Sequence, residues 1–216
     1  MDIRQKTNPI RYWIGSFGYM FFSNVFTLGR SRILYKELRD TLEVPLDATI
    51  VELGCGPGVV TGYLREKIGP EGEIVAVDFA PTMIEQALKR KADNGWDNVE
   101  YTCGDATDFC YSRPVDAIVF SLSLTAMPDY EKVLNNALSA LKDGGQLIIL
   151  DSIPYAATSL TDLAANFYLL CKSLFVGAKP EPAITQYCEK SLDGMTKEKR
   201  VGGVYTLITG RKPIAA

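Results

Sequence analysis

A glycine-rich segment between an apolar run and a helical stretch offers the clearest chemistry in this chain of 216 residues. Residues 50–58 read Ile-Val-Glu-Leu-Gly-Cys-Gly-Pro-Gly. Alternating glycines allow a tight turn and let a ligand approach the backbone without interference from Cβ atoms. The N–H groups of the helix start that follows would face that ligand. The spacing differs from a dinucleotide fingerprint, because Val59 stands where a third glycine or an alanine belongs, and the Gly-Lys-Ser/Thr ending of a phosphate-binding loop is absent.

Three carboxylates stand at or near the ends of successive apolar runs: Glu52, Asp78 and Asp105. Glu52, two residues before the first glycine, would repel a pyrophosphate and attract a cationic ligand, which favours a nucleoside carrying a sulfonium amino acid over a dinucleotide. The two oxygens of Asp78 can accept hydrogen bonds from both hydroxyls of a ribose. Phe79 and Met83 follow at positions that could flank an adenine ring, and Asp105 could accept from its amino group.

The composition removes several alternatives. The chain contains no histidine, so every histidine-based mechanism and histidine-ligated zinc site is excluded. Its five cysteines form no Cys-x-x-Cys pair, which predicts no metal centre and fits free thiols in a reducing cytoplasm. A hydrophobic fraction of 47% and a charged fraction of 23% are typical of a folded globular domain. The net charge of −3 argues against nucleic-acid binding.

The elements that must position these residues follow from the pattern after residue 47. Short apolar β-branched runs alternate with helical stretches, which indicates a parallel sheet covered on both faces, an α/β doubly wound domain. Gly-Pro at 69–70 and Asp-Gly-Gly at 143–145 are expected to end helices. The expected strands are 49–53, 73–77, 99–103, 117–122 and 146–150, and the expected helices are 60–68, 81–92 and 130–141.

The tail has a different pattern. Apolar residues recur at three- and four-residue spacing from Leu160 to Leu174, which predicts an amphipathic helix. A short helix is expected near residues 184–192. Two alternating runs, 197–201 and 204–209, flank Gly202-Gly203 and predict an antiparallel hairpin at the sheet edge.

The glycine segment together with Val77-Asp78-Phe79-Ala80-Pro81-Thr82-Met83, Cys103-Gly104-Asp105-Ala106 and Leu141-Lys142-Asp143-Gly144-Gly145-Gln146-Leu147 resembles the class I S-adenosylmethionine-dependent methyltransferases. The resemblance runs from about residue 47 to 150. It implies a Rossmann-like sheet of seven strands, mostly parallel, with an antiparallel C-terminal hairpin and S-adenosyl-L-methionine as the cofactor. It also implies that Glu52 lies near the methionine ammonium, that Asp78 holds the ribose and Asp105 the adenine, and that the loop from Ser121 to Leu124 passes beside the transfer site. The full set of cofactor-binding residues expected is Glu52, Gly54, Cys55, Gly56, Gly58, Asp78, Phe79, Met83, Asp105, Ala106 and Ser121.

The first 40 residues carry seven Lys or Arg and three acids, a net of +4, whereas the other 176 carry −7. Residues 12–29 contain no charge and seven aromatic side chains. This run is compatible with a membrane span, with an aromatic helical cover on the domain, and with a cover that also contacts an anionic membrane. We expect residues 1–40 to form an aromatic and basic helical cover and residues 41–216 to form the domain that binds S-adenosylmethionine. Residues 19–30 are similar to the N-terminal segments of quinone-biosynthesis C-methyltransferases and of bacterial phosphatidylethanolamine N-methyltransferases.

Direct transfer of a methyl group from the sulfonium to a small-molecule or lipid-like acceptor is the reaction that this resemblance implies. A phospholipid amine and a quinone-type acceptor are favoured. An amine needs only to arrive deprotonated, whereas a phenol or a carbon nucleophile needs a base, for which Tyr19 and Asp151 are candidates. Asp151 could equally cap the next turn. The alternatives are a non-catalytic cofactor-binding module and a methyltransferase that acts on a protein partner. The expected location is the cytoplasm, with or without peripheral membrane contact, and the sequence does not predict an oligomeric state.

Overall fold

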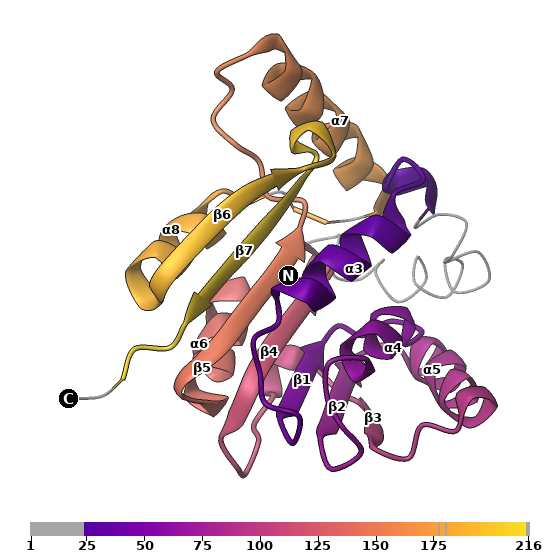
Figure 1. Ribbon diagram of the computed structural model, residues 1–216. Coiled ribbons are helices and arrows are strands. Elements are labelled where there is room, and N and C mark those ends of the chain that lie inside the picture. Colours follow the sequence, from indigo (N-terminus) through magenta and orange to yellow (C-terminus); the bar gives the residue numbers. More distant parts are fainter. Residues whose placement is uncertain (1–23, 177, 180, 215–216) are drawn as a thin grey trace.

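A seven-stranded sheet forms the centre of the computed structural model, which describes residues 24–176, 178–179 and 181–214 (Figure 1). The strand order is β3-β2-β1-β4-β5-β7-β6. Strands β1 to β5 pair in parallel, whereas β7 is antiparallel to both β5 and β6. This confirms the predicted sheet and its C-terminal hairpin. The strands are β1 (Thr49–Leu53), β2 (Glu73–Asp78), β3 (Val99–Cys103), β4 (Val115–Ser121), β5 (Leu141–Asp151), β6 (Asp193–Arg200) and β7 (Tyr205–Arg211).

Helices cover both faces of the sheet, as expected. They are α3 (Ser31–Thr41), α4 (Val59–Arg65), α5 (Pro81–Asn94), α6 (Tyr130–Ala140), α7 (Leu160–Val176) and α8 (Ala183–Ser191), with short 3₁₀ turns η1 (Ala106–Asp108), η2 (Leu124–Ala126) and η3 (Val201–Gly203). The helix predicted for residues 60–68 stops at Arg65, while the last residues of the others lie within a few positions of those predicted.

The segment Asp143-Gly144-Gly145 does not end a helix, which corrects the prediction. Helix α6 stops at Ala140, and the three residues belong to β5. Gly144 takes a φ of 74°, so the strand is irregular there. Its N–H donates to the carbonyl oxygen of Lys212, and the N–H of Lys212 donates to that of Gly145. The Asp-Gly-Gly segment therefore forms an irregularity in β5, and its backbone is hydrogen-bonded to Lys212 in the segment after β7.

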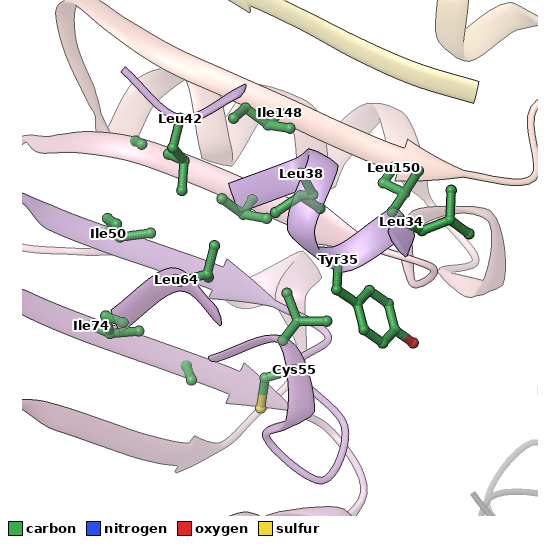
Figure 2. Packing of buried hydrophobic residues seen from close by; sticks show 14 of the residues in the cluster. Leu34, Tyr35, Leu38, Leu42, Ile50, Cys55, Leu64, Ile74, Ile148 and Leu150 are labelled. Carbon is green, nitrogen blue, oxygen red and sulfur yellow. The ribbon is translucent and has the colours of Figure 1, made fainter. Parts of the chain in front are cut away.

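One of the two buried apolar layers lies beneath α3 (Figure 2). Leu34, Leu38 and Leu42 pack in the same cluster as Ile50 of β1 and Ile148 of β5. On the opposite face, α6 and α8 pack on Val51 and Leu53 and their neighbours. The domain boundary that we placed at residue 40 stays a prediction, and α3 runs across that position.

Helix α7 confirms the helix predicted from the repeated apolar residues. The helix is unusual because its apolar side chains Leu160, Leu163, Phe167 and Leu170 are exposed to solvent. The buried positions instead include Asp162, Ala165 and Leu169. The periodicity therefore marks an apolar face that points away from the core.

Candidate functional site

The carboxyl ends of β1, β2 and β3 lie side by side, so Glu52, Asp78 and Asp105 come from neighbouring strands at one edge of the sheet. The N–H groups of Gly54 and Cys55 both donate to the carbonyl oxygen of Val77, at 2.7 and 3.0 Å. The N–H of Gly104 donates to the carbonyl oxygen of Asp78 at 3.0 Å. Strand β1 also pairs with β4, where the chain order reverses. Ligands of open α/β sheets bind at such a reversal, outside the carboxyl ends of the strands.

Asp78 joins the glycine loop to the start of α5. One carboxylate oxygen accepts from the N–H of Gly56 at 2.8 Å, and the other accepts from the N–H of Ala80 at 2.9 Å. The side chain is buried, and this burial raises the pKa of Asp78 although both backbone N–H groups oppose the rise. Each oxygen keeps a second acceptor position. The carboxylate could therefore accept from two neighbouring hydroxyls without giving up its bonds to the loop.

Two of the loop glycines are required by the protein's own packing. Gly54 has a φ of 77°, and a Cβ atom there would lie 2.4 Å from the Cβ atom of Ser123. Gly58 has a φ of 73°, and a Cβ atom would lie 2.4 Å from the hydroxyl oxygen of Tyr101. Ser123 also donates to the carbonyl oxygen of Leu53 at 2.8 Å. The loop after β4 is therefore held directly against the glycine loop, at the edge where a ligand would bind.

Glu52 lies beneath the glycine loop and is almost completely buried. One oxygen accepts from the hydroxyl of Thr61 on α4 at 2.5 Å, whereas Oε1 has no hydrogen-bond partner among the described residues. Burial raises the pKa of Glu52 to about 8, opposed by the bond from Thr61 and assisted by the nearby charge of Asp78. A buried carboxylate oxygen without a partner is rare in folded proteins and suits a site completed by a ligand.

We expect Glu52 to make the free protein less stable as the pH rises from 6 to 8. The folded state retains a proton on Glu52 that the unfolded chain has already released, so unfolding becomes easier across this window. A Glu52→Gln variant should lack this contribution. The difference in free energy of unfolding between wild type and variant should change by about 2 kcal/mol between pH 6 and 8. Urea unfolding at several pH values measures it, and parallel curves for the two proteins would contradict the assignment.

The residues expected around an adenine differ in their exposure to solvent. Phe79 is 42% exposed, whereas Met83 is buried. Asp105 is exposed and caps η1, where one carboxylate oxygen accepts from both the N–H and the hydroxyl of Thr107. Ala106 is buried directly after it. The placement of an adenine among these residues stays a prediction.

The end of β4 carries a strained turn beside the glycine loop. Leu122 has a φ of 55°, a region that few residues other than glycine occupy, and such strain is concentrated at functional sites. The preceding Ser121 is buried, and its hydroxyl has no partner among the described residues.

Cys55 is also buried, and burial raises the pKa of its thiol. Cys55 is therefore an apolar contact in the loop rather than a nucleophile.

Asp151, one of the two candidate bases, is already engaged. It is buried at the end of β5 and accepts from the N–H and hydroxyl of Thr125 and from the N–H of Ser152. Two of these bonds hold the turn after β4 and the third holds the residue after β5, whereas a role of Asp151 as a base or as the cap of the next turn stays a prediction. The other candidate, Tyr19, lies outside the described residues.

Lys172 is a half-buried cation that the sequence pattern did not predict as part of a site. It extends from α7 toward the end of β5 and donates to the hydroxyls of Ser152 at 2.7 Å and Tyr205 at 2.9 Å. Tyr205 in turn donates to the carbonyl oxygen of Phe26. Burial lowers the pKa of Lys172 to about 8, opposed by the charge of Asp151. Lys172 and Asp162 are the only charged residues of α7, and this was the signal available in the sequence.

A Lys172→Met variant should remove a stability contribution that depends on pH above neutrality. The unfolded chain binds a proton on this lysine up to about pH 10.5, whereas the folded protein loses it near pH 8, so the wild type gains stability as the pH rises through this window. Relative to the variant, the wild type should gain about 2 kcal/mol between pH 7 and 9.5. Chemical unfolding at these two pH values tests this prediction, with Lys89→Met, at an exposed position of α5, as the control. An equal pH dependence in all three proteins would show that Lys172 is not desolvated.

The charges at the sheet edge fit a ligand that offers hydrogen-bond donors. Glu52 and Asp78 present acceptor atoms from beneath and beside the loop. The carboxylate of Asp78 would repel a pyrophosphate, whereas an ammonium group and ribose hydroxyls would find acceptors. Among the residues that the structure describes, no group of three or more Cys, Asp or Glu is placed to hold a metal ion.

Comparisons with known proteins agree with this geometry. Residues 47–201 match the family model described as a methyltransferase domain. The demethylmenaquinone methyltransferase of Lactococcus lactis is 30% identical over 105 residues, which cover 48% of this chain and 42% of that protein. The chain thus spans less than half the length of this relative, and half the length of a related enzyme from Listeria monocytogenes that is 28% identical over 118 residues, or 54% of this chain.

A solved structure has the same fold. The N-methyltransferase NodS of Bradyrhizobium japonicum, in complex with S-adenosyl-L-homocysteine, superposes with a TM-score of 0.62 at 18% identity and covers 85% of this chain and 87% of its own. The family match extends over more than half of the chain and includes the glycine loop, Asp78, Asp105 and the end of β5. The chain belongs to the methyltransferase domain family.

Proposed function

We propose that this protein is an S-adenosylmethionine-dependent methyltransferase. The observation that carries the proposal is the contact between Asp78 and the N–H of Gly56, which fixes a two-oxygen acceptor against the glycine loop at the strand-order reversal. In this proposal Asp78 accepts from the ribose hydroxyls, and Glu52 completes the site for the methionine ammonium through its unpartnered oxygen. When bound, S-adenosylmethionine supplies an electrophilic methyl group on a sulfonium.

The chain's own contribution is positioning and the exclusion of water. The loop after β4 is fixed to the glycine loop through Ser123, and it limits the space in which an acceptor can approach. Holding two reactants in line can supply much of the rate enhancement when the electrophile is already activated. This requirement is met without histidine, which the chain lacks.

For the acceptor we propose a lipid-like small molecule, and among these a quinone-type ring is favoured. The support is the name of the Lactococcus lactis relative, which matches only part of each chain. A phospholipid amine is the second candidate, since an amine needs no strong base and Asp151 has its oxygens engaged.

Titration calorimetry with S-adenosyl-L-homocysteine tests the cofactor site without requiring the acceptor. We expect binding near pH 6.5 to release a proton, because Glu52 is protonated in the free protein and ionised beside an ammonium group. Proton release appears as a dependence of the binding heat on the buffer. Glu52→Gln should bind without it, and absence of binding by the wild type would refute the proposed function.

Turnover then separates an enzyme from a cofactor-binding module. Purified protein with methyl-labelled S-adenosylmethionine should label the lipid extract or a demethylated quinone. Binding of the cofactor product without labelling of lipid, quinone, amine or protein fractions would support a non-catalytic module instead.

A further inference from the structure

The outer face of α7, formed by Leu160, Leu163, Phe167 and Leu170, is the largest run of exposed apolar side chains on one element of the described chain. Their exposed fractions run from 56% to 85%. No charged residue shares this face, because Asp162 is buried and Lys172 points to Ser152 and Tyr205. Isolated exposed leucines are normal, but a helical stripe of this kind marks an interaction surface.

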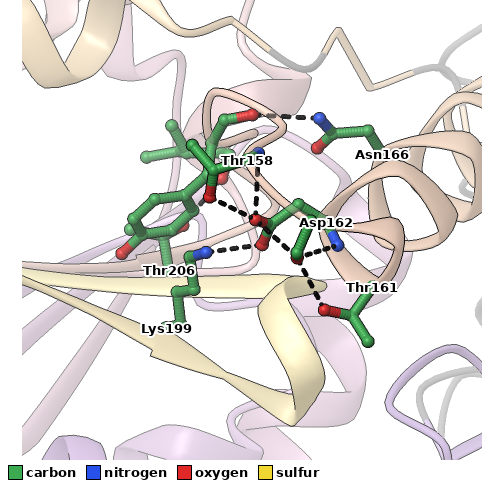
Figure 3. Close-up of polar contacts among 9 residues, drawn as sticks. Thr158, Thr161, Asp162, Asn166, Lys199 and Thr206 are labelled. Atoms are coloured by element: carbon green, nitrogen blue, oxygen red, sulfur yellow. Dashed lines mark hydrogen bonds and ion pairs between the residues drawn. The ribbon is translucent and has the colours of Figure 1, made fainter.

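Polar bonds at the start of α7 fix which face is turned outward (Figure 3). Asp162 accepts from the N–H and hydroxyl of Thr158 and from the hydroxyl of Ser159, and it forms an ion pair with Lys199 of β6. These bonds hold the pKa of Asp162 well below its usual range. Asn166, one turn later, donates to the carbonyl oxygen of Tyr155. A rotation of α7 that buried its leucines would break this set of bonds.

The chain that precedes α3 extends the apolar surface. The hydroxyls of Tyr168 on α7 and Tyr205 on β7 both donate to the carbonyl oxygen of Phe26, so this turn lies against α7 (Figure 1). Val25 and Leu28 in the turn are about half exposed, as is Ile33 at the start of α3.

Basic side chains accompany these apolar residues. Arg30, Arg32 and Lys36 are exposed at the turn and along α3, and none of the ion pairs recorded for the described residues involves them. The acids on α3 are engaged instead, Glu37 with Arg200 and Asp40 with Arg39. The described part of this net-negative chain thus combines an uncharged apolar helix face with cations, on α3 and the turn before it, that form none of the described ion pairs.

The apolar face of α7 and the nearby cations favour one kind of binding partner over another. A symmetric contact with a second copy would bring two sets of these cations together, which is unfavourable. A surface of anionic lipids offers hydrocarbon for the leucines and phosphate for the cations. Within the described residues no helix is long and apolar enough to cross a membrane.

We propose that the outer face of α7, with Arg30, Arg32 and Lys36 beside it, docks on the surface of an anionic lipid bilayer. The inference goes beyond the proposed reaction, because a bilayer can be bound whether or not a methyl group is transferred. Docking there would place the carboxyl end of β5, which α7 adjoins through Lys172 and Ser152, close to the lipid surface.

Sedimentation with vesicles tests the proposal on the chain of 216 residues without cofactor. Vesicles of equal parts phosphatidylglycerol and phosphatidylcholine should bind the wild type, and binding should weaken as salt rises. The triple variant Leu163→Gln, Phe167→Gln, Leu170→Gln should bind on the order of 100-fold more weakly. The matched control Leu46→Gln, Leu88→Gln, Ile214→Gln changes apolar residues of comparable exposure elsewhere and should bind like the wild type.

The charges are tested separately. Arg30→Gln, Arg32→Gln, Lys36→Gln should weaken binding to the anionic vesicles roughly fivefold for each residue and leave binding to pure phosphatidylcholine unchanged. Circular dichroism and the unfolding temperature confirm that each variant is folded.

Two results would overturn the proposal. If the wild type does not sediment with anionic vesicles, the face does not dock on lipid. Sedimentation velocity then identifies the occupant: a dimer that the α7 variant dissociates indicates a second copy, and a monomer that this variant destabilises indicates cover by the chain's own residues 1–23. An equal loss of vesicle binding in the α7 variant and its control would show that the contact is non-specific.

Discussion

A Gly54→Ala variant is expected to lose about 2–5 kcal/mol of unfolding free energy and its affinity for S-adenosyl-L-homocysteine. Two effects combine at this position. A side chain at a φ of 77° is strained, and the new Cβ atom would lie 2.4 Å from the Cβ atom of Ser123. That atom cannot rotate away, because it is bonded directly to the backbone of the loop after β4. Urea unfolding measures the first loss and calorimetry the second.

Gly95 provides the matched control. It takes a φ of 60° at the end of α5, and a Cβ atom there would meet nothing within 4 Å. Gly95→Ala therefore reports the backbone strain alone, about 1 kcal/mol. Ser123→Gly removes the steric partner, so the double variant Gly54→Ala, Ser123→Gly should cost less than the sum of the single changes. Additive costs would show that the two loops do not meet as the structure places them.

The parallel part of the fold was predictable from the sequence, because a strand buried on both faces is written as an unbroken apolar run. Strand β1, whose last four residues are buried, begins and ends at the predicted residues. The Asp-Gly-Gly segment misled the prediction, since glycines suit a strand irregularity as well as a helix end. Only the tertiary contact with Lys212 decides between the two.

The candidate site was predictable where a residue's role depends on its position at a strand end. Asp78 and the loop glycines follow from that rule. Ser123 and Tyr101 could not be found in this way, because their contacts with Gly54 and Gly58 join segments that are far apart in the sequence. Lys172 is a similar case, since its partners are on β5 and β7. The helical period located α7 but could not say which of its faces would be turned outward.

Asp78→Ala should weaken binding of S-adenosyl-L-homocysteine by about 3 kcal/mol, on the order of 100-fold, because it removes two acceptors that a charge strengthens. The same change also frees the N–H groups of Gly56 and Ala80, so a loosened loop could by itself reduce affinity. Asp116→Asn serves as a control for general destabilisation. Asp116 lies near the start of β4, away from the glycine loop. Its partly buried carboxylate accepts from the N–H of Thr49 and pairs with Lys142. It should lower stability and leave affinity within about twofold.

A ligand without the 2′-hydroxyl separates the direct role of Asp78 from its role in the loop. If Asp78 accepts from the ribose, the wild type should bind the 2′-deoxy ligand at least tenfold more weakly than the parent ligand, whereas Asp78→Ala should bind the two almost equally. The loop bonds to Gly56 and Ala80 are absent in both measurements on the variant, so they cancel in the comparison. An undiminished preference of the variant for the 2′-hydroxyl would mean that another group recognises the ribose, and Asp78 would then be a positioning residue for the glycine loop.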